Sequence, residues 1–420
     1  MIKLLIIADD FTGGLDTGVQ FAAKGIRTCV VTDPGADFEK AADGNEVLVV
    51  VAETRHMPAG QAYNTVYRVV EKSVALGIPH IYKKTDSALR GNIGAELSAV
   101  LDASGEKTLM FVPAMPGIRR ITVGGVHSID GVPVAQSVFG KDPFEPVRES
   151  DVTKLIALQS KTPTWKAAPD SIPQQEGIVI VDAQSDEDLC TAGRTLQAMG
   201  ALRVTAGCAG FGAVLPKALG LHVSDEPKIP GLAPGLFVLC GSVNPITQRQ
   251  LAKAEKEGFA RVHIRPDQKL TEGYFDTAEG RVDLESWRIA NRQAPWMILD
   301  ANDLEDGNKA SAAYAAAHHM SMEDVRRSIS GALGRILPRM LDGMAKKTVL
   351  ITGGDTLLQC MNAMRVTQME PLLEVFPGVV LSRFTVDGQP QLVITKSGGF
   401  GKETLLCDLK KLIEDQQNQK

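Results

Sequence analysis

The chain has 420 residues, of which 44% are hydrophobic and 23% are charged. This balance excludes intrinsic disorder as the main state, and the length predicts two or three domains rather than a single core. The net charge of −5 at pH 7 argues against a nucleic-acid-binding protein, because such proteins carry a clustered excess of Lys and Arg.

The first two hundred residues alternate between short apolar runs and helix-length segments. The runs are rich in Val and Ile and lack polar alternation, which is typical of strands buried on both faces. The predicted strands are Ile2–Ala8, Thr28–Thr32, Val47–Ala52, His80–Lys83, Leu109–Val112, Ile178–Val181 and Leu202–Thr205. The helices predicted between them include Leu15–Lys24, Ala59–Leu76 and Ile93–Leu101. This order predicts βαβ units around a mostly parallel sheet.

The stretch Gly117–Thr164 interrupts this alternation, because it is rich in Gly, Pro and Asp. It predicts a long irregular excursion or a hairpin. The stretch Ser224–Gly235 contains three prolines and two glycines, a composition typical of a linker.

Strand–helix alternation resumes after this linker. The predicted strands are Phe237–Cys240, Met297–Leu299, Thr348–Thr352 and Leu392–Thr395, and the longest predicted helix is Ser311–Leu341. We therefore predict an α/β protein with two domains, residues 1–228 and 229–420, each a mostly parallel sheet flanked by helices.

The six cysteines are scattered, and no two of them have a metal-binding spacing. This usage predicts a reduced, cytoplasmic protein. The apolar run at the N-terminus is short and ends at Asp9 and Asp10, unlike a signal peptide. No apolar stretch approaches the roughly 20 residues that span a bilayer, so we expect no membrane association.

Two adjacent carboxylates, Asp9 and Asp10, follow the first predicted strand and precede Gly13 and Gly14. In open α/β sheets, ligands bind beyond the carboxyl ends of the strands. One carboxylate could act as a general base while the other orients a group or binds a metal, and the glycines let backbone N–H groups approach an anion. The alternative is that Asp10 or Thr12 only caps the next helix.

Charged and hydroxyl side chains also follow the third and fourth predicted strands. Arg55 follows the third strand, and the segment Lys83–Asn92 follows the fourth. Two cations beside hydroxyl groups suit a hydroxylated ligand that carries a carboxylate. The alternative is a solvated charged loop in which Asn92 caps a helix.

Glycine-containing junctions follow three predicted strands of the second half. They are Gly241–Pro245, Gly353–Thr356 and Lys396–Gly401. Together they predict a cradle of backbone N–H groups for a polyphosphate, although each alone is an ordinary turn. The P-loop pattern and the Gly-x-Gly-x-x-Gly fingerprint are both absent from the sequence.

These segments together resemble the four-carbon acid sugar kinase family, over nearly the whole chain and in the same order. The matching segments are Ala8–Gly13, Lys84–Gly94, Pro113–Pro116, Gly353–Asp355 and Lys396–Gly401. The family includes D-threonate, D-erythronate and 3-oxo-tetronate kinases, and Lys83–Ser87 is more similar to the threonate and erythronate branch.

The resemblance implies that the N-terminal domain binds a small-molecule sugar acid and that the C-terminal domain binds ATP with Mg²⁺. It implies Asp10 as the catalytic base and places the substrate near Asp10, Arg55, Lys84, Thr85, Asp86, Ser87 and Arg90. It places the nucleotide near Ser242, Gly353, Gly354, Asp355, Thr356 and Gly398. Within this set, we expect Arg55, Lys84 and Arg90 to hold the substrate carboxylate. The metal ligands stay open, with Asp9, Asp86 and Asp355 as candidates.

The resulting hypothesis is phosphorylation of D-threonate at its 4-hydroxyl. The alternatives are D-erythronate or 3-oxo-tetronate as the substrate, or an inactive nucleotide- or metabolite-binding regulator of the same fold. A homodimer is a possible assembly. One position departs from the family pattern, because Arg119 stands before Arg120 where the family usually has glycine. This departure leaves the local backbone and the substrate choice open.

Overall fold

The structure is a computed structural model that describes residues 2–142, 145–223, 228–304, 307–341, 347–386 and 388–418. The chain divides into two compact units, Met1–Pro227 and Lys228–Lys420. Part of the predicted linker, residues 224–227, lies outside the described residues. None of the helices in these ranges is long and apolar enough to cross a membrane.

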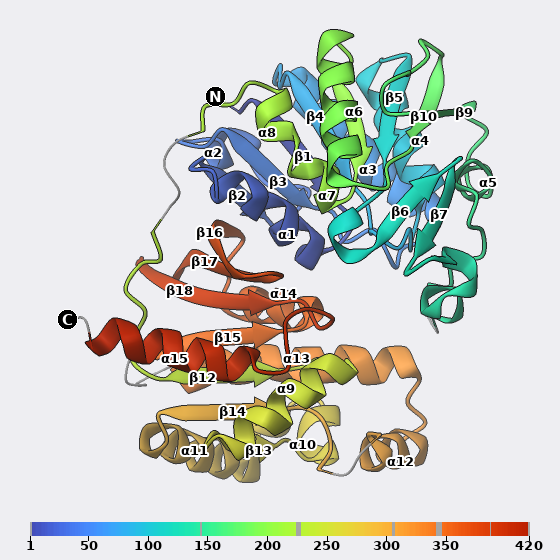
Figure 1. The fold of residues 1–420 in the computed structure, drawn as a ribbon. Coiled ribbons are helices and arrows are strands. Elements are labelled where there is room, and N and C mark those ends of the chain that lie inside the picture. The colour runs from blue at the N-terminus through green and yellow to red at the C-terminus, as the bar shows by residue number, and fades with distance from the viewer. Residues whose placement is uncertain are drawn as a thin grey trace. The chain divides into compact units, whose positions relative to one another are not determined.

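The N-terminal unit contains one sheet in the order β2-β3-β1-β4-β11-β5-β10-β9, and its neighbouring strands are parallel (Figure 1). The strands are β1 (Leu4–Ala8), β2 (Thr28–Val31), β3 (Val47–Val51), β4 (His80–Lys84), β5 (Thr108–Val112), β9 (Thr164–Ala167), β10 (Gly177–Val181) and β11 (Val204–Gly207). Every residue of β1 and β3 is buried, as the continuous apolar runs predict.

Helices cover both faces of this sheet. They are α1 (Phe11–Ala22), α2 (Phe38–Ala41), α3 (Ala59–Ala75), α4 (Ile93–Ser104), α5 (Val152–Ala157), α6 (Asp186–Ala198), α7 (Ala209–Gly212) and α8 (Leu215–Ala218). Helix α3 packs beside α4, whereas α1 and α6 both pack against α7. The predicted helix and strand boundaries of this unit differ from the observed ones by no more than a few residues.

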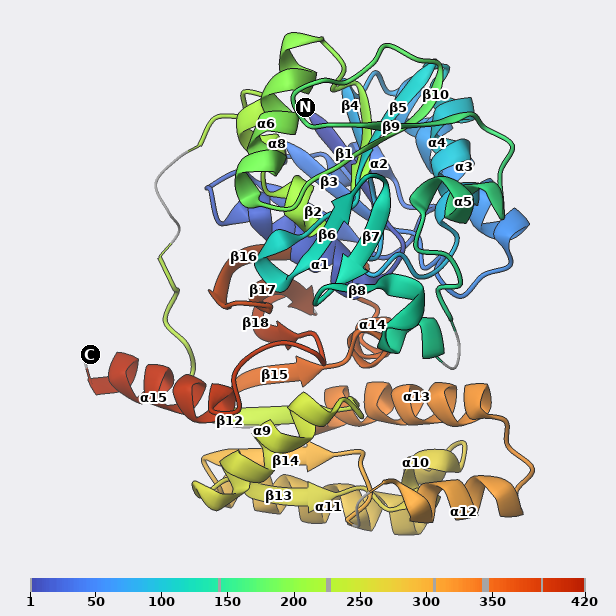
Figure 2. The ribbon, with the colours of Figure 1, turned by 45° about the vertical axis from the view of Figure 1, so that its right-hand side comes forward.

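The excursion after β5 forms a small antiparallel sheet of β6 (Arg120–Val123), β7 (Val126–Ile129) and β8 (Val132–Pro133), which lie side by side in Figure 2. The 3-10 turns η1 (Pro116–Ile118), η2 (Val134–Gln136) and η3 (Val138–Lys141) flank it. The turn between β6 and β7 contains Gly124 and Gly125, both with positive φ, which only glycine adopts freely. The hairpin predicted in this region is confirmed.

The C-terminal unit contains a sheet in the order β13-β14-β12-β15-β18-β17-β16. The strands are β12 (Leu236–Cys240), β13 (Ala260–His263), β14 (Trp296–Asp300), β15 (Thr348–Thr352), β16 (Gln368–Phe376), β17 (Val379–Val386) and β18 (Gln389–Lys396). Strands β13 to β18 in this order are parallel, and β17 and β16 then continue the sheet in antiparallel fashion. The predicted fold class, two domains with mostly parallel sheets, is therefore confirmed.

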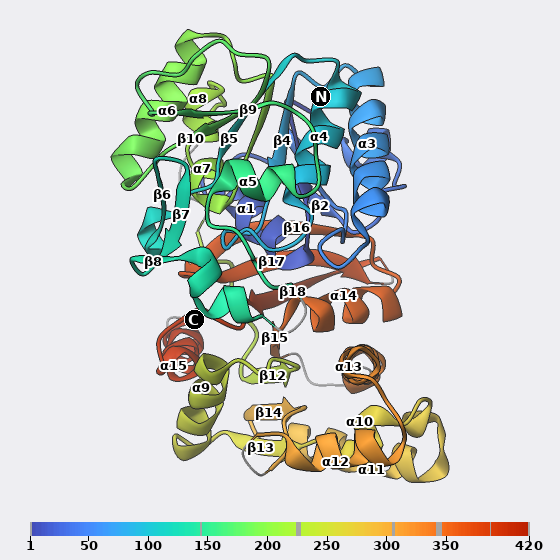
Figure 3. The same ribbon diagram turned by 90° about the vertical axis from the view of Figure 1, so that its right-hand side faces the viewer.

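Helices also cover both faces of the second sheet, as Figure 3 shows. They are α9 (Pro245–Lys256), α10 (Pro266–Leu270), α11 (Ala278–Gln293), α12 (Lys309–Ala317), α13 (Met322–Leu341), α14 (Gly354–Ala363) and α15 (Leu405–Asn418), with the 3-10 turn η4 (Tyr274–Asp276). Helices α9 and α15 pack together, and α13 packs on α14.

The single long helix predicted over Ser311–Leu341 is wrong, because the segment forms two helices, α12 and α13. His319 has a φ of 54°, a left-handed conformation that no α-helix continues through. Ser321 then caps α13, since its hydroxyl accepts a hydrogen bond from the Asp324 amide at 3.1 Å while the Asp324 carboxylate accepts one from the Ser321 amide at 3.0 Å. This reciprocal pair is a capping box, which fixes a helix start.

The start of α4 depends on glycine at position 94. A Cβ added there would lie 2.4 Å from the carbonyl oxygen of Ile156, whereas a Cβ on Gly60 in α3 would meet nothing within 4 Å. We expect Gly94→Ala to lower the free energy of unfolding by about 1–3 kcal/mol through overpacking. We expect the control Gly60→Ala to raise it by about 0.5–1 kcal/mol through helix propensity. Urea denaturation of both variants checks this, and equal stabilities would contradict it.

Candidate active site

The carboxyl ends of three adjacent parallel strands bring the predicted N-terminal residues together. Strand β1 lies between β3 and β4, with Ala8 in register with Val51 and Lys84. The loops that follow these strands therefore leave the same edge of the sheet.

Arg55 holds both aspartates of the first loop. Its Nε donates to Asp9 Oδ2 at 2.8 Å, and its Nη1 donates to Asp10 Oδ2 at 2.8 Å. The other oxygen of Asp10 accepts a hydrogen bond from the Gly13 amide at 2.9 Å and so caps α1. Asp10 is therefore a helix cap and an arginine partner at once. Its side chain is 23% exposed, against 3% for Asp9, so Asp10 is the aspartate that a ligand can reach.

Charges around Asp9 keep it ionised although it is buried. Burial alone would raise the pKa of Asp9, but Arg55, Lys84 and Lys83 together lower it below its usual value. The pKa of Arg55 is raised well above its usual value, because the neighbouring carboxylates outweigh the cost of burial. Lys84 Nζ lies 3.9 Å from Asp9 Oδ1, an oxygen with no hydrogen-bond partner among the described residues.

The loop after β4 is organised by Asp86. Arg90 donates to it through Nε at 2.9 Å and Nη2 at 3.1 Å, and the Ala88 amide donates to Oδ2 at 3.2 Å. Burial would raise the pKa of Asp86, but Arg55 and Arg90 hold it well below its usual value. The carboxylate therefore shapes this loop from within. The Ser87 hydroxyl accepts a hydrogen bond from Arg120 Nη1.

Asn92 occupies the N-cap position of α4, as the alternative predicted, but its side chain makes no capping hydrogen bond. Its Nδ2 donates instead to the carbonyl oxygens of Thr54 at 2.9 Å and Met57 at 2.8 Å. These bonds join the loop that carries Arg55 to the start of α4.

Arg119 takes the conformation that glycine would take. Its φ is 56°, in the left-handed region, and its Nε pairs with Asp130 at 2.7 Å on an 80% exposed side chain. The sequence departure therefore leaves the glycine-like backbone intact and directs the extra cation to the surface. Arg120 is the arginine that reaches the loop after β4, and no residue-level signal singled it out from its neighbour.

In the C-terminal unit, the three predicted glycine junctions also meet at one edge. Strand β15 lies between β12 and β18, with Thr352 in register with Cys240 and Lys396. A Cβ on Gly398 would lie 2.6 Å from Ser242 Oγ, and a Cβ on Gly241 would lie 2.0 Å from Thr356 Oγ1. Gly353, which precedes α14, has a φ of 106° that only glycine adopts freely. Gly398 and Gly241 therefore leave the space that the Ser242 and Thr356 hydroxyl groups occupy.

A buried amine supports this cradle from below. Lys396 Nζ donates to Thr247 Oγ1 at 3.0 Å and to the carbonyl oxygens of Ser397 and Gly398 at 2.9 and 3.2 Å. Thr247 Oγ1 donates in turn to the Gly398 carbonyl at 2.9 Å. Burial lowers the pKa of Lys396 to about 8, because its hydrogen-bond acceptors are neutral. An anion beside the cradle would favour the charged amine.

Two helices begin at the cradle. Asn244 caps α9 by accepting a hydrogen bond from the Ile246 amide at 2.9 Å, and Pro245 is the first helical residue. Helix α14 begins at Gly354 without a side-chain cap. Its first N–H groups and its positive dipole end are therefore open to an anion.

The carboxylates proposed as metal ligands differ in how well they fit Mg²⁺. Asp9 and Asp86 are buried and bonded to arginines, which disfavours a second cation beside them. Asp355 is 47% exposed and has one arginine contact, Arg326 at 2.8 Å. Among the described residues, no group of three or more His, Cys, Asp or Glu side chains is arranged to hold a metal. Of the three candidates, Asp355 is therefore the one whose carboxylate is accessible to a metal.

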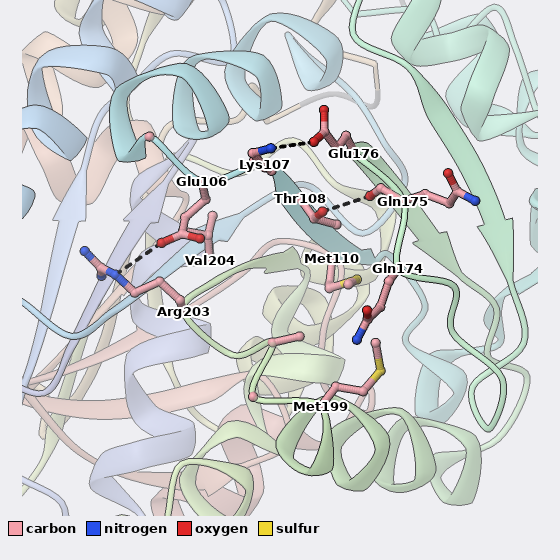
Figure 4. Close-up of a pocket in the computed structure, with 13 residues that line it drawn as sticks. Glu106, Lys107, Thr108, Met110, Gln174, Gln175, Glu176, Met199, Arg203 and Val204 are labelled. Atoms are coloured by element: carbon pink, nitrogen blue, oxygen red, sulfur yellow. Dashed lines mark hydrogen bonds and ion pairs between the residues drawn. The ribbon is translucent and has the colours of Figure 1, made fainter.

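A separate cavity of about 390 Å³ lies at the opposite, amino-terminal ends of β5, β10 and β11 (Figure 4). Its charged side chains face one another, with Lys107 paired to Glu176 at 2.8 Å and Arg203 to Glu106 at 3.9 Å. The cavity is therefore on the edge of the sheet that parallel α/β proteins do not use for catalysis.

The fold is that of a ligand-binding α/β protein in which each unit gathers polar groups at the carboxyl edge of a parallel sheet, and comparison with known proteins specifies its class. Residues 4–215 match the family described as a sugar-binding N-terminal domain, and residues 237–406 match the nucleotide-binding C-terminal domain. The chain belongs to the four-carbon acid sugar kinase family and is a sugar-acid kinase.

Curated relatives cover nearly the whole chain. A D-threonate kinase of Salmonella typhimurium is 31% identical, with 99% of both chains aligned. A D-erythronate kinase of Heliobacterium modesticaldum is 27% identical, covering 97% of this chain and 96% of its own. A crystal structure from Salmonella typhimurium LT2 has the same fold, with a TM-score of 0.81 at 19% identity over 98% of this chain and 100% of its own. The relatives and the nucleotide-binding domain imply that the reaction uses ATP.

The structure thus brings the predicted residues together within each unit. Asp10, Arg55, Lys84, Asp86, Ser87 and Arg90 gather at one edge, and Ser242, Gly353, Gly354, Thr356 and Gly398 at another. Thr85 is buried behind this surface, with its amide bonded to the Gly207 carbonyl at 2.8 Å. Arg55 and Arg90 are bonded to protein carboxylates, which leaves these two cations less available to a substrate anion.

The cradle allows a matched test. An added Cβ at Gly398 would lie 2.6 Å from Ser242 Oγ, whereas one at the adjacent Gly399 would meet only Asn244 Nδ2 at 3.8 Å. We expect Gly398→Ala to raise the KM for ATP about tenfold, equivalent to roughly 1.4 kcal/mol, because Ser242 or the loop at Gly398 must move to accommodate the added Cβ. Gly399→Ala should change it by less than about twofold. Steady-state kinetics decide this, and equal KM values for the two variants would contradict it.

Proposed function

We propose that the protein transfers the γ-phosphoryl group of ATP to the 4-hydroxyl of a four-carbon sugar acid, with D-threonate as the preferred substrate. The observation that carries the proposal is a partly exposed carboxylate, Asp10, fixed among cations at the carboxyl edge of the N-terminal sheet. The relative with 31% identity, a D-threonate kinase, supports the choice of acid.

Asp10 is the general base in this proposal. Its carboxylate accepts the proton of the 4-hydroxyl, the substrate oxygen forms a bond to the γ-phosphorus, and the bond from phosphorus to the leaving ADP oxygen breaks. Arg55 and the Gly13 amide fix the two oxygens of Asp10, so the carboxylate needs little reorganisation.

Lys84 supplies positive charge at the same end of the site. Its ammonium group and Asp10 Oδ1 both lie within 2.5 Å of the point where a Gly13 Cβ would be, so the two groups are neighbours. A cation there stabilises the negative charge that accumulates on the transferred phosphoryl group.

The nucleotide would bind on the glycine cradle of the C-terminal unit. Ser242, the N-terminus of α14 and the loop at Gly398 present donors suited to phosphate oxygens. Mg²⁺, when bound with ATP, neutralises phosphate charge, and Asp355 is the carboxylate that fits it.

The second candidate is the same reaction on D-erythronate or 3-oxo-tetronate. The D-erythronate kinase at 27% identity and a 3-oxo-tetronate kinase of Methylobacterium radiotolerans at 26% identity favour it almost as strongly. The candidate acids differ at C2 and C3, in configuration or, for 3-oxo-tetronate, by a ketone at C3, so the reaction at the 4-hydroxyl is common to both candidates. An inactive regulator is disfavoured, because Asp10, Lys84 and the cradle glycines are all present.

The role of Asp10 can be tested with a matched cap variant. Asp10→Asn keeps the oxygen that caps α1 but loses the charge, so we expect turnover to fall at least about 10³-fold while ATP affinity stays within about twofold. Asp37 caps α2 in the same way, by accepting from Glu39 and Lys40 amides, and is exposed. Asp37→Asn should therefore keep full activity. Turnover of Asp10→Asn near the wild-type rate would exclude Asp10 as the base.

Substrate choice is tested by ADP release with D-threonate, D-erythronate, 3-oxo-tetronate and their enantiomers where available. We expect the highest kcat/KM with D-threonate, by about tenfold or more over the next acid, which corresponds to one or two well-placed hydrogen bonds. A higher value for another four-carbon acid would reassign the substrate. No ADP release with any of them would overturn the proposed kinase activity for these acids.

A further inference from the structure

The cations of the N-terminal site are not equally available to a ligand. Arg55 bonds to Asp9 and Asp10 and lies 3.7 Å from Asp86, and Arg90 bonds to Asp86 through two nitrogen atoms. A guanidinium group already shared between carboxylates has little capacity left for a further anion.

Arg120 is different. None of the ion pairs within the described part of the chain includes it, although its neighbour Arg119 pairs with Asp130. Its Nη1 donates to the hydroxyl of Ser87, a neutral acceptor. A guanidinium carries five N–H donors, so this contact leaves donors for a ligand. Burial lowers the pKa of Arg120, and the nearby Asp86 carboxylate, which raises it, offsets this effect only in part.

Stacking on an aromatic ring also holds Arg120 in position, and this contact uses none of its N–H donors. It begins β6, and its guanidinium carbon lies 5.0 Å from the centroid of the Phe139 ring. The Arg90 guanidinium lies 5.3 Å from the same ring. Stacking on an aromatic face holds a guanidinium plane while its edge N–H groups remain open. Arg120 is therefore held in place with its hydrogen-bonding edge unsaturated.

The site also has a direction. Asp10 is joined to Arg55, Arg55 approaches Asp86, and Ser87 follows Asp86 with Arg120 on its hydroxyl. Asp10 and Arg120 are thus the first and last members of this series of contacts. A four-carbon acid has the same polarity, with a hydroxyl at C4 and a carboxylate at C1.

We infer that Arg120, together with Ser87, binds the substrate carboxylate and thereby directs the 4-hydroxyl toward Asp10. This inference rests on the proposed function. It replaces the expectation that Arg55 and Arg90 hold the carboxylate, since those arginines serve to fix Asp9, Asp10 and Asp86. The planar fork of an arginine suits a carboxylate, which it can bind through two parallel hydrogen bonds.

The test compares an acid with its neutral amide. Dissociation constants of D-threonate and D-threonamide are measured by isothermal titration calorimetry for the full-length wild type, Arg120→Met, Arg120→Lys and Arg119→Met, and ADP release is recorded for each. Arg119→Met removes the adjacent arginine, whose side chain is 80% exposed, and serves as the control. We expect the wild type to prefer the acid by about 10- to 100-fold, as for a hydrogen-bonded charged pair.

Arg120→Met should lose most of that preference, with D-threonate weakened and D-threonamide little changed. Arg120→Lys should recover part of it, and Arg119→Met should match the wild type. A loss of fold would weaken both ligands alike and shift the thermal midpoint, so it is distinguishable from loss of the charge contact.

An Arg120→Met variant that folds and keeps the wild-type preference for the acid would overturn the role of Arg120 and leave the proposed kinase activity standing. Failure of the wild type to release ADP with any four-carbon acid would overturn both. The two failures are therefore separable by the wild-type measurement alone.

Discussion

The N-terminal site depends on one guanidinium group. Asp9 and Asp10 follow strand β1, and Asp86 follows the adjacent strand β4, so the three carboxylates lie at one sheet edge. Asp9 and Asp86 are buried there. Removing one partner from such a buried charge cluster costs about 3–5 kcal/mol. Arg55 contacts all three carboxylates, so it determines their spacing. The chain makes room for it with Gly91, which has a φ of 87° and where an added Cβ would lie 3.1 Å from Arg55 Cγ.

The C-terminal unit has glycines, not a charged cluster, at the carboxyl edge of its sheet. At its sheet edge the glycines let strand ends and helix starts approach one another, so backbone N–H groups supply the binding surface. The buried amine of Lys396 beneath them is bonded to neutral oxygens, and burial lowers its pKa to about 8. A bound anion would supply the counter-charge that its hydrogen-bond partners do not provide, whereas Arg55 of the N-terminal cluster is paired with carboxylates of the chain.

Much of this arrangement could be predicted from the sequence. Continuous apolar runs identify the strands of a parallel sheet, and ligands bind beyond the carboxyl ends of such strands. The all-apolar runs at Val47–Val51 and Thr348–Thr352 identified strands, and the residues after them were then expected at one edge. What could not be predicted were contacts between side chains far apart in the chain. Arg55, for example, bonds to Asp9, which lies 46 positions earlier in the chain, and the composition of neither segment indicates this pair.

Three further features that the sequence did not predict have physical causes. The helix boundary at His319 depends on one left-handed residue in an Ala-rich segment whose helical propensity continues on both sides. Strands β16 and β17 form an antiparallel ribbon with irregular register, so neither shows the continuous apolar run that marks a parallel strand. Arg120 was hidden because it enters the site through a hairpin whose register, Arg120 opposite Ile129, is set by a glycine turn.

The relatives of similar identity are named for three different substrates, and the two ends proposed for the N-terminal site help to explain this. D-Threonate, D-erythronate and 3-oxo-tetronate share a C1 carboxylate and a C4 hydroxyl, so the two ends proposed at Arg120 and Asp10 do not distinguish them. Discrimination then falls to groups that meet C2 and C3. Specificity within this family can therefore change at the middle of the site while the phosphoryl-transfer end and the carboxylate end stay the same.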